Sequence, residues 1–223
     1  MAVVTRPDHE LKKEAMYQLD WDSRVDTSHI KVDASEGRIS LTGTVPTYRA
    51  KLAAETDVLS VPGATAIDNT LRIEPRPSAE APADNQIRRN IIDLLEWNTS
   101  IDMTEIEVSV NKGEVTFDGS VPTYWQKVLV EEAALDLAGV GKVVNRLSVV
   151  PTENVVDEAV AKAIVAAFDN NFLIDVDSVN VQVSGGVVTL TGTVSSWTAY
   201  FSALTIVRRT LGVTDIRDML RVE

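Results

Sequence analysis

One ten-residue segment occurs three times in this chain, and its spacing constrains the fold more than any other feature. The first copy is Ile39-Ser-Leu-Thr-Gly-Thr-Val-Pro-Thr-Tyr48, and it returns at 115–124 and more loosely at 188–197. The offsets between copies are 76 and 73 residues. That period is too long for one turn of a solenoid and long enough for a small domain with its own core. The sequence therefore predicts three similar modules in tandem.

The repeat extends well beyond this segment, so module boundaries can be drawn. Asp8, Asp84 and Asp157 keep the same offsets at the start of a predicted helix. The predicted organisation is an N-terminal arm at 1–7, a linker at 76–83, and modules at 8–75, 84–151 and 152–223. The linker is rich in Pro and Ala, a composition typical of extended spacers.

The same element order is expected in every module. An amphipathic helix is followed by a strand, a glycine hairpin and a second strand in which apolar residues alternate, such as Ile39 and Leu41. A second helix begins near Thr47, Thr123 or Ser196, and a third strand ends the module. Because a helix joins strands two and three, we expect these to be parallel neighbours. The fold class is therefore α+β: α-β-β-α-β modules, each a three-stranded mixed sheet with both helices on one face.

Glycines recur at three positions in each module and are predicted to be structural. They fall in the hairpin, at the end of the second strand, and after the second helix. These sites favour a turn, a bulge or close backbone approach, and a left-handed helix cap, respectively. The nine residues are Gly37, Gly43, Gly63, Gly113, Gly119, Gly139, Gly186, Gly192 and Gly212.

Charge and composition exclude several classes of protein. The net charge is −12, and the three modules carry −4, −5 and −4, so none offers the basic face that nucleic acid requires. The chain has no cysteine and no apolar run of the roughly 18 residues that span a membrane. Its first residues do not resemble a signal peptide, so we expect a cytoplasmic protein, or a periplasmic one if the sequence is a trimmed mature form.

Catalytic and metal-binding patterns are weak. His9 and His29 are the two histidines, and neither recurs in another module. Asp20, Asp22 and Asp26 resemble part of a calcium loop, but the required glycine and terminal Glu are missing. Turn formation explains these aspartates better. We predict a non-enzymatic protein without cofactor or metal.

Aromatic residues at the start of the second helices are the candidate binding residues. They are either fillers at the core edge or anchors for lipid or protein, since Tyr and Trp suit half-wet sites. Arg208 and Arg209 form a basic doublet nearby in the last module, whereas Trp21 and Trp97 are expected at the core edge. The candidate anchors are Tyr48, Tyr124, Trp125, Trp197, Tyr200 and Phe201.

These repeated features resemble the BON domain family, the bacterial osmotic-stress and nodulation-associated modules. The resemblance rests on the nine glycines, on the valines Val45, Val121 and Val194, and on Asn69 and Asn145 in the third strands. The third module departs from it with Asp218 in place of Asn and Ser195 in place of Pro. The family is not catalytic, so the resemblance implies a stress-associated binding module that docks on phospholipid or membrane surfaces.

The rival hypothesis is an adaptor or chaperone-like protein. It would bind polypeptide or glycan through the open sheet faces or the aromatic helix entrances. This alternative fits the acidic charge better, and either reading allows an oligomer.

Overall fold

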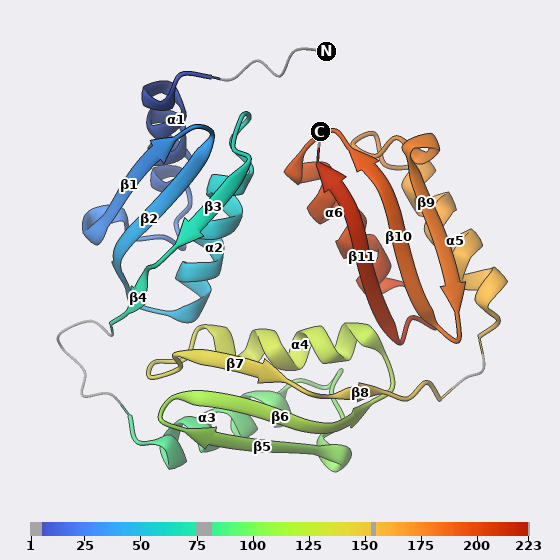
Figure 1. Ribbon diagram of the computed structural model, residues 1–223. Helices are drawn as coiled ribbons and strands as arrows, with labels where there is room; N and C mark the ends of the chain where they lie inside the picture. Colours follow the sequence, from blue (N-terminus) through green and yellow to red (C-terminus); the bar gives the residue numbers. More distant parts are fainter. Residues whose placement is uncertain (1–5, 75–81, 153–154, 223) are drawn as a thin grey trace. The chain divides into compact units, whose positions relative to one another are not determined.

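The computed structural model describes residues 6–74, 82–152 and 155–222. It shows three modules, each with two helices and a small sheet (Figure 1). The α+β class and the three-module organisation are confirmed. The predicted arm and linker lie largely outside the described residues, and the module boundaries stay a prediction.

The elements follow the predicted order, with a short 3₁₀ helix between the first helix and the first strand of each module. The first module contains α1 (Asp8–Trp21), η1 (Thr27–His29), β1 (Ile30–Ser35), β2 (Arg38–Val45), α2 (Tyr48–Leu59), β3 (Ala66–Asn69) and β4 (Arg72–Ile73). The second contains α3 (Asp84–Trp97), η2 (Met103–Glu105), β5 (Ile106–Asn111), β6 (Glu114–Val121), α4 (Tyr124–Leu135), β7 (Lys142–Asn145) and β8 (Ser148–Val149). The third contains α5 (Asp157–Asp169), η3 (Val176–Ser178), β9 (Val179–Ser184), β10 (Val187–Val194), α6 (Trp197–Arg209) and β11 (Asp215–Val222).

The second strand of each module is central in its sheet. In the first module β2 pairs antiparallel with β1, in a register that sets Val32 opposite Leu41, and parallel with β3 and β4. In the third module β10 pairs antiparallel with β9 and parallel with β11. Both helices of a module lie on the same face of its sheet (Figure 1). The predicted mixed sheets are therefore confirmed, although in the first two modules the third strand is broken in two, which gives four strands instead of three.

Each core lies between the helices and the inward-facing strand residues. In the first module Leu11, Ala15 and Leu19 of α1 are fully buried against Ile39 and Leu41 of β2. Their spacing follows helical and strand periodicity, respectively, which is why one face of each element is apolar. No polar or charged residue is buried as a whole in the described parts of the chain, so the cores are built from apolar side chains.

The glycine near the end of the second strand lies where the last carbonyl of the preceding 3₁₀ helix comes very close to that strand. At Gly119, φ is +120°, and a Cβ atom would lie 1.9 Å from the carbonyl oxygen of Glu105. Gly43 and Gly192 have the same conformation, and a Cβ atom added there would lie 1.9 and 2.1 Å from the carbonyl oxygens of His29 and Ser178. No side chain fits there, because the preceding 3₁₀ helix delivers a carbonyl into the space. All nine repeated glycines have positive φ.

Polar side chains hold the connections in place. Asp26, Asp102 and Asp175 cap the three 3₁₀ helices through the backbone amides two residues on. At the first turn of α3, Asp84 accepts hydrogen bonds from the hairpin amides of Lys112 and Gly113 at 2.7 and 3.0 Å. Asp157 makes the matching pair to Gly185 and Gly186. Asp84 and Asp157 therefore tie the first helix to the hairpin in the second and third modules.

Candidate functional site

The aromatic residues at the entrances of the second helices are half-buried. Tyr48, Tyr124 and Trp125 have intermediate exposure, as do Trp197, Tyr200 and Phe201. The three aromatics of α6 form one cluster with ring centroids 5.1–6.0 Å apart. In the second module the Lys127 ammonium lies 5.9 Å from the Tyr124 ring. These side chains contribute to packing at the helix entrance, and a ligand role for them stays a prediction.

The aromatic cluster of α6 also explains why the third module has Asp218 where the others have Asn. Asn69 and Asn145 donate to the second helix, at the carbonyls of Lys51 and Lys127. Asp218 cannot donate, and the Tyr200 hydroxyl donates to it instead. Burial, together with this hydrogen bond, raises the pKa of Tyr200 to about 12. Tyr200 occupies the position that the two lysines hold in the other modules.

Trp21 and Trp97 do not lie at the core edge, which corrects the sequence-based prediction. They are 71% and 86% exposed, and Phe172, two residues past the matching position of the third module, is 96% exposed. The sequence contains the spacing that predicts this exposure. Each tryptophan follows a buried leucine by two residues, which places it about 200° around the helix from the apolar stripe.

We call Trp21, Trp97 and Phe172 the exposed aromatic tips. Each lies at or just beyond the end of the first helix of its module. In α1 the ring of Tyr17, itself exposed, packs 5.9 Å from that of Trp21, and Leu94 of α3 is exposed near Trp97. Solvent-exposed aromatics grouped with other apolar residues mark interaction surfaces more often than single exposed side chains do. The exposed aromatic tips are therefore the strongest candidate site in the described residues.

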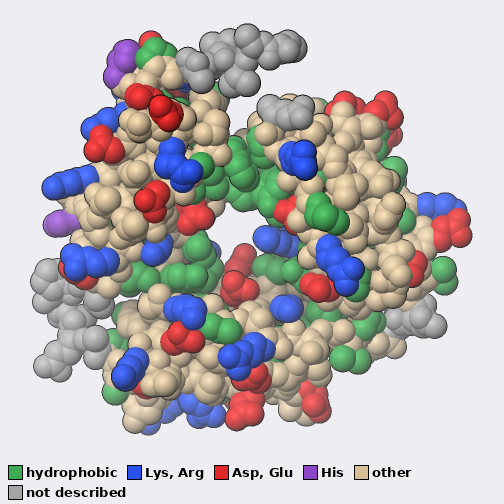
Figure 2. All heavy atoms as spheres, in the orientation of Figure 1, with side chains coloured by type: hydrophobic (Ala, Val, Ile, Leu, Met, Phe, Trp, Pro, Cys, Tyr) green, Lys and Arg blue, Asp and Glu red, His purple; other side chains and the backbone are tan. Residues whose placement is uncertain are grey.

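A cation recurs near each tip. Lys13, Arg89 and Lys162 occupy matched positions on the first helices, about two turns before the tip, and all are exposed. An acid follows each cation by seven residues, at Asp20, Glu96 and Asp169. Charge is therefore locally balanced, and Figure 2 shows acidic and basic side chains interspersed over the visible face. Arg208 and Arg209 are exposed in the last turn of α6.

One cluster of charges is unique to the first module. Asp22, after α1, accepts hydrogen bonds from the backbone and the guanidinium of Arg24. Asp57 of α2 lies beside them, with Arg24 Nη2 3.9 Å from Asp57 Oδ1. Its Oδ2 atom is buried and has no hydrogen-bond partner among the described residues. Ala133 and Ile206 hold the matching positions in the other modules.

The two carboxyls of this cluster have opposite pKa shifts. The hydrogen bond from Arg24 lowers the pKa of Asp22 to about 2. Burial, reinforced by the charge of Asp22, raises the pKa of Asp57 to about 7. Asp57 therefore exchanges its proton in the physiological range.

The metal-ligand pattern suggested by the sequence does not form a metal centre in the described residues. Within them no three His, Cys, Asp or Glu side chains converge as metal ligands. Asp22 and Asp26, which superficially resemble calcium ligands in sequence, serve as turn and cap residues. No helix in these parts of the chain is long and apolar enough to cross a membrane.

Comparison with known proteins identifies the family. The family description "BON domain" matches three times, at residues 7–75, 83–151 and 156–223. The chain belongs to the BON domain family. Each BON module therefore coincides with one α-β-β-α-β unit of the structure.

Similarity to individual proteins is weaker. The chain is 28% identical over 145 residues to a 21 kDa hemolysin of Actinobacillus pleuropneumoniae, which covers 64% of this chain and 74% of that protein. Among solved structures, CdsD, a structural protein of the Chlamydia trachomatis Type III secretion system, shares 14% identity with a TM-score of 0.27, covering 96% of this chain and 92% of CdsD. The periplasmic domain of the S. typhimurium inner membrane protein PrgH shares 13% with a TM-score of 0.24, covering 87% and 94%. At such TM-scores neither structure informs the fold or function of this chain.

Proposed function

We propose that this protein is a stress-associated, non-enzymatic binding protein that docks on phospholipid surfaces through its exposed aromatic tips. One observation carries the proposal: the first helices of the first two BON modules end in a tryptophan that is more than two-thirds exposed, and the third module has Phe172 nearby. A tryptophan left in water buries its ring favourably at the headgroup level of a bilayer. The family and the name of the hemolysin relative support a membrane role.

The charge pattern determines what kind of lipid binding to expect. With a net charge of −12 and an acid near every tip, the chain as a whole is not attracted to anionic lipid at long range. Lys13 and Arg89 reach headgroup phosphates only once the rings have inserted, with their stems along the apolar surface. Each module therefore binds weakly, and several modules on one chain gain affinity through their high effective concentration.

Co-sedimentation with phosphatidylcholine vesicles, with and without phosphatidylglycerol, tests this function. Trp21→Ser together with Trp97→Ser should abolish most binding, whereas Leu211→Ser, which removes a comparably exposed apolar residue, should leave binding unchanged. A variant that keeps Trp21 as its one tryptophan should show a blue shift on binding. Binding retained by the double variant would exclude the tips, and no binding by the wild-type chain would exclude the function.

An adaptor role is the second candidate, favoured by the acidic charge of all three modules. Exposed tryptophans are also frequent anchors in protein interfaces. Recovery of one partner by the wild-type chain but not by the double variant, in the absence of vesicle binding, would favour this role. The cytoplasmic location expected from the sequence stays a prediction, and cell fractionation tests it.

A further inference from the structure

The outer face of α5 differs from those of α1 and α3. At the middle of these helices, Ala166 of α5 matches the outward Tyr17 of α1 and Asp93 of α3. The adjacent Val165 matches Met16 and Ile92, which are apolar but larger. Val165 is 40% exposed, and Ala166 is exposed as well. The middle of the outer face of α5 therefore carries small apolar side chains, whereas α1 and α3 carry larger or charged side chains there.

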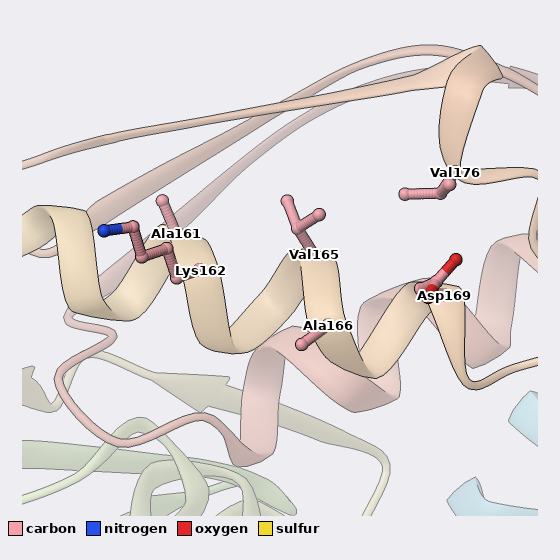
Figure 3. Close-up of a pocket in the computed structure, with 6 residues that line it drawn as sticks. All are labelled: Ala161, Lys162, Val165, Ala166, Asp169 and Val176. Atoms are coloured by element: carbon pink, nitrogen blue, oxygen red, sulfur yellow. The ribbon is translucent and has the colours of Figure 1, made fainter.

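A shallow depression of about 390 Å³ runs along this helix. Ala161, Val165 and Ala166 line it from α5, and Val176 lines it from η3. Figure 3 shows Val165 and Val176 pointing toward the same space, with Lys162 and Asp169 at opposite ends of the labelled set. The lining is apolar in the middle and charged at both ends.

The two charges lie along a single stripe of the helix. They are seven residues apart, which is two turns, a 20° offset and about 10 Å of rise. Lys162 pairs with Glu158 at 2.6 Å, but both side chains are 75% exposed, so that pair is worth little. Asp169 lies in the last turn, where the helix dipole disfavours an acid, and it has no ion-pair partner among the described residues.

We propose that α5 docks antiparallel on α5 of a second copy of this chain. A two-fold axis between Val165 and Ala166 places Lys162 of each copy opposite Asp169 of the other. The Asp169 side chain of each copy then gains a cationic partner, and the apolar depression of each copy is covered by the other copy. A surface whose opposite charges are symmetric about an apolar centre is complementary to itself, which is the requirement for an isologous contact.

The alternatives explain less of this surface. A membrane would cover Val165 and Ala166 but has no cation at a fixed position opposite Asp169. The corresponding residues of α1 and α3 keep the charges but interrupt the apolar centre with Tyr17 and Asp93. Self-association through α5 is independent of the lipid proposal, since it uses neither Trp21 nor Trp97.

Charge reversal on the full chain, without lipid, tests the pairing. Sedimentation velocity from about 5 to 500 µM should show a concentration-dependent dimer. Lys162→Asp or Asp169→Lys alone should weaken it by about tenfold or more, because two attractions become repulsions, and the double variant should restore it. Arg89→Asp, the same charge change at the matched position of α3, should leave it unchanged.

Three outcomes would overturn the proposal. These are a wild-type chain that remains monomeric throughout, a dimer that resists both single reversals, and single reversals that the double variant fails to rescue.

A covalent test gives the geometry independently. The chain contains no cysteine, so Ala166→Cys introduces one thiol next to the proposed axis. Mild oxidation should link two copies. Asp93→Cys, at the matched and also exposed position of α3, should not form a dimer efficiently. Equal cross-linking of both variants, or none of the α5 variant, would contradict the antiparallel contact.

Discussion

Replacing Asp57 with asparagine should stabilise the first BON module at pH 8 and leave its stability nearly unchanged near pH 4. The carboxyl is partly buried beside Asp22, and one of its oxygens has no hydrogen-bond partner in the described parts of the chain. Asparagine has the same shape and no charge, so it mimics the protonated acid at every pH. The matched positions, Ala133 and Ile206, show that the other modules place no charge there.

The sign and size of the effect follow from proton linkage. Because the folded-state pKa is raised from 3.8 to about 7, the folded module holds a proton that the unfolded chain has released. The free energy of unfolding therefore falls as pH rises from about 4 to 7, and the full loss is present above 7. The whole shift would correspond to about 4 kcal/mol. Since one side of the carboxyl reaches water, screening reduces this to about 1–2 kcal/mol.

Hydrogen exchange of the intact chain at pH 5 and pH 8, corrected for intrinsic rates, measures the effect module by module. Wild-type amides of α2 and β2 should lose protection at pH 8 relative to those of α4 and β6, which serve as an internal control. Asp57→Asn should remove that difference. Parallel pH dependence in the wild-type chain and the variant, within about 0.5 kcal/mol, would show that Asp57 is ionised in the folded module and refute the reasoning.

Three further changes test the scaffold. Gly119→Val should destabilise the second module by at least about 2 kcal/mol, because its Cβ meets the Glu105 carbonyl oxygen, and calorimetry should show one transition moving to lower temperature. Asp84→Ala should cost about 1–3 kcal/mol and speed amide exchange in the adjoining hairpin, since two charge-assisted hydrogen bonds are lost. Tyr200→Phe should remove the tyrosine that ionises near pH 12 in an ultraviolet titration; in the wild-type chain, ionisation of that group should reduce stability as pH rises above about 10.

The sequence predicts the interior of each module well because the interior is periodic. Alternation in β2, with Ile39 and Leu41 inward, and the stripe Leu11, Ala15 and Leu19 in α1 are local patterns with a fixed geometric meaning. The repeated glycines mark sites where the backbone leaves no room for a side chain. Threefold repetition makes each such pattern three observations instead of one.

The prediction that Trp21 and Trp97 lie at the core edge is wrong for a physical reason. These cores are filled without tryptophan, by leucine, isoleucine, valine and alanine, with a single phenylalanine, Phe117 or Phe168, fully buried in each of the last two modules. Size alone does not decide burial. The position of Trp21 relative to Leu19 on the helix does, and that angle is available from the sequence.

The charge cluster of the first module was beyond sequence reasoning. Asp57 is more than thirty residues from Asp22 and Arg24, and only the packing of α2 against the end of α1 brings them together. Local sequence patterns do not predict contacts between distant residues. The repeat gives no help either, because the cluster occurs in one of the three modules.

Comparison of matched positions shows where the three BON modules differ in sequence. Their cores and hairpins repeat, whereas the outward positions of their helices do not: Lys51 becomes Tyr200, Asp57 becomes Ala133, and Tyr17 becomes Ala166. Three identical weak sites would gain affinity only for a ligand that itself repeats. Because the helix faces differ in aromatic content, charge and side-chain size, one module can bind a phospholipid surface while another binds a second copy of the chain. The proposed α5 contact would then double the number of exposed tryptophans in one assembly. The weak lipid affinity of each tip would be offset by the larger number of tips that bind together.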